Sequence, residues 1–123
     1  GIEAEVLDLR SIRPIDENAI FNSVEKTGHI LVVDNGWTHI NVGSEIVARV
    51  SEKRFNLLKS PPRRLGLRDV PIPSTRALAN LAYVSQAEII DAVSEQIGLK
   101  LEIHWDKVTQ IDDVPNREFK GPF

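Results

Sequence analysis

The sequence contains no cysteine, and this absence removes several kinds of chemistry at once. Without a thiol the chain has no disulfide, no thiolate nucleophile and no cysteine ligand for a metal, and a reducing compartment suits it. It also has no apolar run close to the roughly 20 residues that cross a bilayer, and its N-terminus does not have the form of a signal peptide. We expect an intracellular protein, unless a targeting segment has been lost from a fragment.

A large excess of charge of one sign is absent as well. The 15 basic and 18 acidic residues give a net charge of −3, so the broad positive field that attracts nucleic acid or anionic membranes is missing. We therefore expect neither nucleic-acid nor membrane binding. With 123 residues, of which 41% are hydrophobic and 27% charged, the chain fits one ordinary globular domain with its own core.

The stretch 28–50 is predicted to organise the domain. Ile30–Val33 is an uninterrupted apolar run with β-branched residues, which is typical of a strand covered on both faces of a sheet. After Gly36 the period changes, and Ile46 and Val50 belong to the apolar stripe of a helix. The loop at 36–41 therefore connects a buried strand to an amphipathic helix.

A similar pair of elements precedes this stretch. Residues 5–9 predict a strand that starts abruptly, without an element before it. Asp16 is a good N-cap for the following helix, Ile15 and Ile20 are placed as a hydrophobic staple, and Gly28 can end the helix. Strand, helix, strand and helix in this order predict an α/β fold with a parallel sheet and right-handed crossovers.

The chain then becomes irregular. Pro61 and Pro62 break regular structure, residues 64–67 are a short strand candidate, and the X-Pro steps at 69–73 keep that segment extended over the surface. Residues 75–82 are expected to form one or two helical turns.

The last predicted helix has the clearest boundaries. Ser85 and Glu88 form a capping box, an apolar stripe follows, and Gly98 stops the helix. Residues 99–105 alternate as a strand with one exposed face does. Residues 106–123 have no sustained period, and we expect either an extended tail that docks on a partner or disorder.

Candidate binding residues cluster after the central strand. His39 lies beside Trp37 in the loop where ligands bind in open α/β sheets. It is a catalytic or ligand-binding histidine, an ordinary loop residue, or a residue that packs on a neighbouring subunit. The backbone amides at Asn41, Gly43 and Ser44 could bind an anion at a helix N-terminus. Capping and close packing of helix on sheet explain these residues more simply.

Charged residues elsewhere give weaker indications. A basic group after the two prolines is either a clamp for an acidic partner or a solvated edge; its members are Arg63, Arg64 and Arg68. The carboxylates closest to predicted strand ends are Asp34, Glu45 and Asp69, and the sequence pairs none of them as acid and base. In the polar C-terminal stretch three large aromatic residues are costly to expose, so we favour docking of Trp105, Phe119 and Phe123 onto another surface.

Taken together, these segments resemble the C-terminal domain of the transketolase family. The similarity is closest to the beta subunits of thiamine-diphosphate-dependent 2-oxo acid dehydrogenases. It is carried, in order along the chain, by GIEAEVLDLRSIRPID at 1–16, KTGHILVVDNGW at 26–37, VGSEIVARVSE at 42–52, PPRRLGLRDVPIPSTRAL at 61–78 and AEIIDAV at 87–93.

The resemblance implies a three-layer α/β/α domain with a mostly parallel, five-stranded sheet. Family members have one more strand and helix ahead of the position of Gly1, so we expect an N-terminally truncated domain over residues 1–105 followed by the tail at 106–123. An apolar face would then be partly uncovered, and either a second chain or the missing segment is expected to cover it.

The resemblance also implies a role without catalysis. In the family, thiamine diphosphate and magnesium are held by the preceding domains, so no catalytic, cofactor or metal residue is assigned here, and the isolated domain is expected to be inactive. Expected partners are the alpha subunit, a second beta subunit and the dihydrolipoyl acyltransferase core, in the cytoplasm or, in a eukaryote, the mitochondrial matrix. The alternatives are a nucleotide- or small-molecule-binding regulatory module and a transketolase-like enzyme acting on sugar phosphates.

Overall fold

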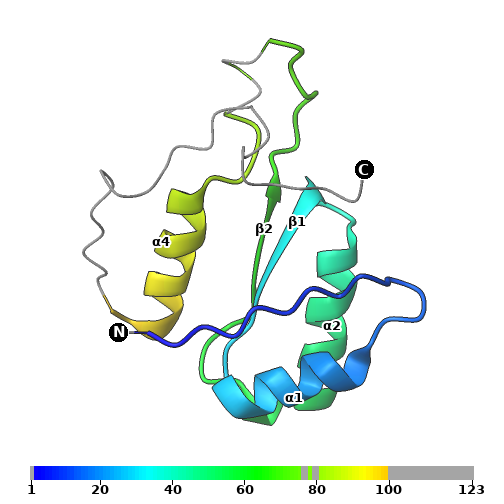
Figure 1. The fold of residues 1–123 in the computed structure, drawn as a ribbon, viewed down its shortest axis with the longest axis vertical. Coiled ribbons are helices and arrows are strands. Elements are labelled where there is room, and N and C mark those ends of the chain that lie inside the picture. The colour runs from blue at the N-terminus through cyan, green and yellow to red at the C-terminus, as the bar shows by residue number, and fades with distance from the viewer. Residues whose placement is uncertain (1, 76–77, 79–80, 100–123) are drawn as a thin grey trace, which may run out of the picture.

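The structure is a computed structural model that describes residues 2–75, 78 and 81–99. The two strands in this part pair in parallel and form the middle layer (Figure 1). Helices α1 and α2 cover one face of the strands, and α4 covers the other. The elements are α1 (Glu17–Thr27), β1 (Leu31–Trp37), α2 (Val42–Arg54), the short 3-10 helix η1 (Phe55–Leu57), β2 (Arg63–Leu67) and α4 (Gln86–Ile97). The α/β class and the layered arrangement are therefore confirmed.

Helix α1 begins and ends where local sequence signals place its boundaries. The Asp16 carboxylate accepts a hydrogen bond from the Ala19 N–H at 3.0 Å. At the other end Gly28 has a φ of 78°, and its N–H donates to the Val24 carbonyl at 2.8 Å. A left-handed φ of this kind suits glycine because it has no Cβ. Both predicted boundaries are confirmed.

Helix α4 is the best-defined element of the second half. Ser85 accepts from the Glu88 N–H, and the Glu88 carboxylate accepts from the Ser85 N–H at 2.7 Å, which completes the predicted capping box. Gly98 ends the helix with a φ of 67°. Gln96 then fixes α4 to the sheet layer, because its amide donates to the Ile30 carbonyl at 2.9 Å and to the Pro61 carbonyl at 3.1 Å.

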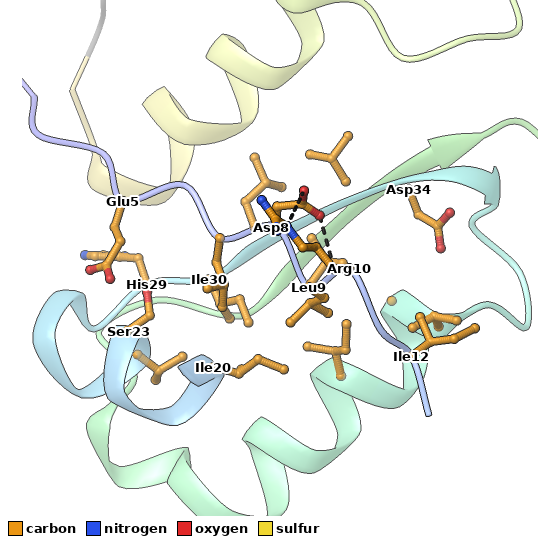
Figure 2. Close-up of a pocket in the computed structure, with 18 residues that line it drawn as sticks. Glu5, Asp8, Leu9, Arg10, Ile12, Ile20, Ser23, His29, Ile30 and Asp34 are labelled. Atoms are coloured by element: carbon orange, nitrogen blue, oxygen red, sulfur yellow. Dashed lines mark hydrogen bonds and ion pairs between the residues drawn. The ribbon is translucent and has the colours of Figure 1, made fainter. Parts of the chain in front are cut away.

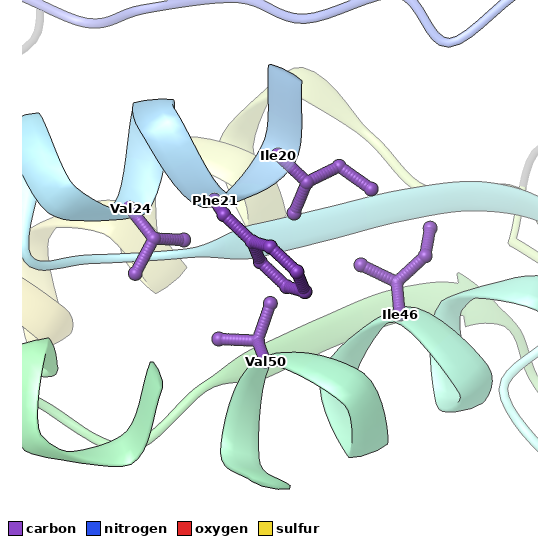
Figure 3. Packing of buried hydrophobic residues seen from close by; sticks show 5 residues of the cluster. All are labelled: Ile20, Phe21, Val24, Ile46 and Val50. Carbon is purple, nitrogen blue, oxygen red and sulfur yellow. The ribbon is translucent and has the colours of Figure 1, made fainter. Parts of the chain in front are cut away.

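The hydrophobic core lies between β1 and the two helices on its first face (Figure 3). Val24 of α1 and Val50 of α2 are fully buried. Ile30 and Val32 pack against the cluster from the strand side, as the prediction of a central strand requires. The buried cluster consists of Ile20, Phe21, Val24, Ile46 and Val50.

The opposite face of β1 is less covered than the sequence predicts. Val33 is 46% exposed, although the apolar run Ile30–Val33 predicts a strand that is buried on both sides. In the described residues β1 pairs with β2 along one edge only, so Val33 lacks a neighbouring strand on its other side. The expected coverage on both faces is therefore wrong at Val33.

The strand predicted at 5–9 is also absent. This segment is extended but pairs with no strand in the described residues, and Val6 is 91% exposed. It is held instead by an ion pair of 3.2 Å between Glu5 and Lys26, and by Leu9, which packs on the core. A strand exists only where another strand supplies hydrogen bonds, and the side-chain pattern of a single segment cannot reveal whether that partner is present.

The remaining predictions fall partly outside the described residues. At 75–82 two turn-type hydrogen bonds of 3.1 Å are present, from the Leu78 N–H to the Thr75 carbonyl and from the Leu81 N–H to the Leu78 carbonyl. Residues 76–77 and 79–80 are not described. The predicted strand at 99–105, beyond Leu99, and the tail at 106–123 lie outside the described residues and stay predictions.

Candidate interaction surface

The surface with the clearest functional character follows the carboxyl end of β1. Trp37 is 50% exposed, and it is paired in register with Leu67 of β2. The Thr38 N–H continues this pairing by donating to the Leu67 carbonyl at 3.1 Å. His39 and Ile40 follow, and both are exposed. The structure thus places the predicted pair Trp37 and His39 on the surface, at the end of the sheet.

Ile40 combines two locally unfavourable properties. It is 86% exposed, and its φ is 51°, in the left-handed region that a β-branched residue rarely adopts. Such a conformation costs on the order of 1–3 kcal/mol. The exposed aliphatic side chain makes Ile40 a candidate contact residue only as part of a larger apolar patch.

The segment after β2 leaves the sheet at the same end as the loop after β1 (Figure 1), and its sequence carries further apolar residues. Val70 and Ile72 alternate with prolines in an arm that bends at residues 69–70, and both are exposed. We define the strand-end surface as Trp37, Ile40, Val70 and Ile72. The sequence analysis did not name Val70 and Ile72 as candidates, although the X-Pro steps that predict an exposed arm could have indicated them.

The residues at the start of α2 cap the helix and let it pack closely on β1, which is the simpler of the two roles predicted for them. The Asn41 side chain accepts from the Ser44 N–H at 2.9 Å and so caps the helix. A Cβ placed on Gly43 would lie 3.2 Å from Cγ1 of Val32, so glycine permits the close approach of helix and strand. Arg64 also donates to the Ser44 hydroxyl and, at 2.7 Å, to the Thr38 carbonyl. Capping and packing account for these residues.

The three arginines do not form one basic group. Consecutive strand residues point to opposite faces, and accordingly Arg63 pairs with Glu95 of α4, whereas Arg64 binds the loop before α2. Arg68 lies 3.8 Å from Glu88, and both side chains are exposed. The Ser85 backbone N–H, and to a smaller extent Arg68, lower the pKa of Glu88.

An ion-pair network between α1 and α2 was missed by the sequence reasoning. Glu17 pairs with Arg49 and, at 2.7 Å, with Lys53. Hydrogen bonds from Lys53 and then Arg49 lower the pKa of the Glu17 carboxyl. Arg49 also pairs with Glu45, four residues earlier on the same helix, at 2.7 Å. Because Glu17 lies on another helix, no spacing within one helix could have indicated its role.

No acid–base pair is formed by the other carboxylates considered above. Asp34 accepts from the Gly36 N–H at 2.8 Å within β1, where the register with β2 shifts between Val33 and Trp37, and Asp69 is exposed. Among residues 2–75, 78 and 81–99, no group of three or more His, Cys, Asp or Glu side chains is placed to hold a metal ion. The predicted contact residues Trp105, Phe119 and Phe123 lie outside the described residues.

Comparison with known proteins agrees with the layered fold. The family model described as "Transketolase, C-terminal domain" matches residues 1–90. The chain belongs to this family.

Several similar proteins are beta subunits of the pyruvate dehydrogenase E1 component. The chain is 41% identical over 93 residues to the pyruvate dehydrogenase E1 component subunit beta of Rhizobium meliloti, covering 76% of the chain and 20% of that protein. It is 43% identical over 102 residues to the mitochondrial subunit beta of Drosophila melanogaster, covering 82% of the chain and 28% of that protein. For the mitochondrial mouse subunit the identity is 42% over 100 residues, with coverages of 80% and 28%.

These relatives are much longer than this member of the family. The chain spans 20% to 28% of the length of the three relatives named above. In the part of the chain that the structure describes, no helix combines the length and apolar character needed to cross a membrane.

Proposed function

We propose that the chain is an assembly domain of the beta-subunit type found in 2-oxo acid dehydrogenases, and that it holds subunits together without taking part in bond chemistry. The observation that carries this proposal is the strand-end surface, where Trp37 and a strained Ile40 expose large apolar side chains. Aromatic and aliphatic residues of this kind are the usual anchors of stable protein–protein interfaces.

The polar groups of the domain support the same proposal. The Glu17, Arg49 and Arg64 side chains are occupied by contacts that fix one element on another. The resemblance to beta subunits supports a division of labour in which other parts of the enzyme hold thiamine diphosphate and magnesium, decarboxylate the 2-oxo acid and transfer the acyl group to a lipoyl arm.

The alpha subunit is the proposed partner of the strand-end surface, and the second beta subunit and the acyltransferase core are further partners. The test is light scattering after size-exclusion chromatography of the purified chain mixed with the E1 alpha subunit of its own source organism. We expect a complex that the Ile40→Asp variant loses. The matched variant Asn22→Asp places the same charge on an exposed position of α1 and should leave the complex intact.

Two results would contradict the proposal. The first is equal complex formation by both variants, or no complex with the unmodified chain. The second is turnover of pyruvate by the chain alone with thiamine diphosphate and magnesium. A thermal-shift screen separates the alternatives, because nucleotides should raise the melting temperature of a regulatory module, sugar phosphates that of a transketolase-like enzyme, and neither that of an assembly domain.

A further inference from the structure

The loop between β1 and α2 presents Ile40 in a conformation that needs support. Ile40 has a φ of 51° and its side chain is 86% exposed, so packing of that side chain does little to hold it in place. A β-branched residue stays in the left-handed region only where the surrounding structure fixes it there. The groups that fix this loop therefore decide how Ile40 is presented to a partner.

Strand β2 holds the start of the loop. The Thr38 N–H donates to the Leu67 carbonyl at 3.1 Å. A Cβ placed on Gly66 would lie 2.6 Å from the Gly36 carbonyl oxygen and 3.2 Å from Cγ2 of Thr38. The two backbones can approach this closely because residue 66 is glycine. These contacts fix the loop as far as Thr38.

One side chain of β2 connects the two ends of the loop. Arg64 pairs in register with Val32, which lies against the start of α2, and residues paired in this way share one face of the sheet. From that face Nη1 of Arg64 donates to the Thr38 carbonyl at 2.7 Å and to the Ser44 hydroxyl. Thr38 precedes Ile40 and Ser44 follows it, so one guanidinium closes the loop around Ile40. Hydrogen bonds from a charged donor are stronger than those between neutral groups.

The Ser44 hydroxyl extends this support to the residue after Ile40. It donates to the side-chain oxygen of Asn41 at 3.1 Å, and the same oxygen accepts from the Ser44 N–H at 2.9 Å. A hydroxyl can donate one hydrogen bond while it accepts another, so the contacts with Arg64 and Asn41 are compatible. Arg64, Ser44 and Asn41 therefore form one hydrogen-bonded chain that ends directly beside Ile40.

The N-terminal segment gives the loop no comparable support in the part of the chain that the structure describes. A cavity of about 570 Å³ lies between residues 5–12 and β1 (Figure 2). Asp34 of β1 lines it, as do Val42 and Gly43 at the start of α2. The hydrogen bonds and ion pairs described for the N-terminal segment do not reach the loop. The loop is therefore held from the β2 side, where Arg64 lies.

We propose that Arg64 is a positioning residue of the strand-end surface, which closes the loop in advance into the conformation that presents Ile40 to the alpha subunit. This role rests on the proposed assembly function and deepens it by naming the side chain that shapes the contact. A contact loop that is already ordered loses less conformational freedom on binding, so the partner binds more tightly. Without the guanidinium the loop would leave the strained conformation and would have to be ordered again in the complex.

Isothermal titration of the full 123-residue chain with the E1 alpha subunit tests this role. Arg64→Met removes the guanidinium but keeps most of the aliphatic stem, and it should weaken binding by about fivefold to tenfold because the loop must then be ordered during binding. The matched variant is Arg63→Met. Arg63 is the neighbouring arginine of β2 but pairs with Glu95 of α4, so its loss should change the dissociation constant by less than about twofold.

A double-mutant cycle separates positioning from a direct contact of Arg64 with the partner. Ile40→Ala shortens the presented side chain while the weakened binding stays measurable. If Arg64 acts through Ile40, adding Arg64→Met to Ile40→Ala should change the dissociation constant by less than about twofold. Fully additive effects of the two substitutions would overturn the positioning role.

Amide hydrogen exchange of the chain without its partner measures the loop itself. In Arg64→Met, exchange at Thr38 and Ser44, which lie at the two ends of the loop, should be faster by about tenfold, whereas exchange at the buried Val50 should stay within about twofold. Equal acceleration at all three amides would show that Arg64 only stabilises the whole fold. That result, or unchanged exchange at Thr38 and Ser44, would overturn the positioning role.

Failure of this role can be told apart from failure of the assembly function. If the unmodified chain forms no complex with the alpha subunit, both are overturned. If the unmodified chain binds and Arg64→Met binds equally well, or if Arg63→Met weakens binding as much, only the role of Arg64 is overturned.

Discussion

Replacing Phe21 by alanine tests the packing of the core most severely. Phe21 is 7% exposed, lies between α1 and α2, and has the Arg54 guanidinium 4.5 Å from its ring centroid. Truncation of a buried phenylalanine costs about 3–5 kcal/mol, and loss of a cation–π contact adds about 0.5–1 kcal/mol at a partly exposed site. A domain of this size has a free energy of unfolding of about 5–15 kcal/mol, so Phe21→Ala should remove a large part of it.

Urea unfolding followed by circular dichroism measures this loss, with Phe55→Ala as the matched control. Phe55 is 69% exposed, so its truncation should change the free energy of unfolding by no more than about 0.5 kcal/mol. A loss below about 1 kcal/mol for Phe21→Ala, or equal losses for the two variants, would refute the assignment of the core between α1 and α2.

Three further outcomes are expected. Because the folded-state pKa of Glu17 lies below its usual 4.5, the Glu17 carboxylate stabilises the fold above that pH, and this stabilisation is lost as the pH falls through the folded-state pKa. Glu17→Gln should therefore reduce the fall in the free energy of unfolding at acid pH. An unchanged fall would argue against the network. Ser85→Ala should lower the free energy of unfolding by about 1 kcal/mol by removing the cap of α4, whereas Ser74→Ala, at an exposed bend, should leave denaturant curves unchanged. Ile40→Gly should raise the melting temperature of the isolated chain by relieving the positive φ and weaken its binding to the alpha subunit; a fall in melting temperature would show that Ile40 is not strained.

The sequence predicts those parts of the fold that depend on neighbours along the chain. The N-cap at Asp16, the capping box at Ser85 and the glycines that end both helices are all signals within a few residues, and each is confirmed. The parallel order of strands and helices was also predictable, because the apolar period changes between β1 and α2.

The features that depend on distant neighbours could not be predicted in this way. Residues 5–9 have the side-chain pattern of a strand but have no strand partner in the described residues, and Val33 is exposed for the same reason. Arg63 and Arg64 are adjacent in sequence but serve opposite faces of the sheet layer. The strain at Ile40 lies in its positive φ, which the residue type does not reveal, so the sequence could not indicate Ile40 as part of the candidate site.

The central claim is that the apolar side chains at the carboxyl end of the sheet bind a subunit. Isothermal titration of the chain with the E1 alpha subunit at several temperatures tests it most directly, because burial of apolar surface gives a negative heat-capacity change of binding. We expect binding with a clearly negative heat-capacity change that Ile40→Asp reduces and Asn22→Asp does not. No heat of binding at any temperature, or a heat-capacity change that Ile40→Asp leaves unaltered, would contradict it.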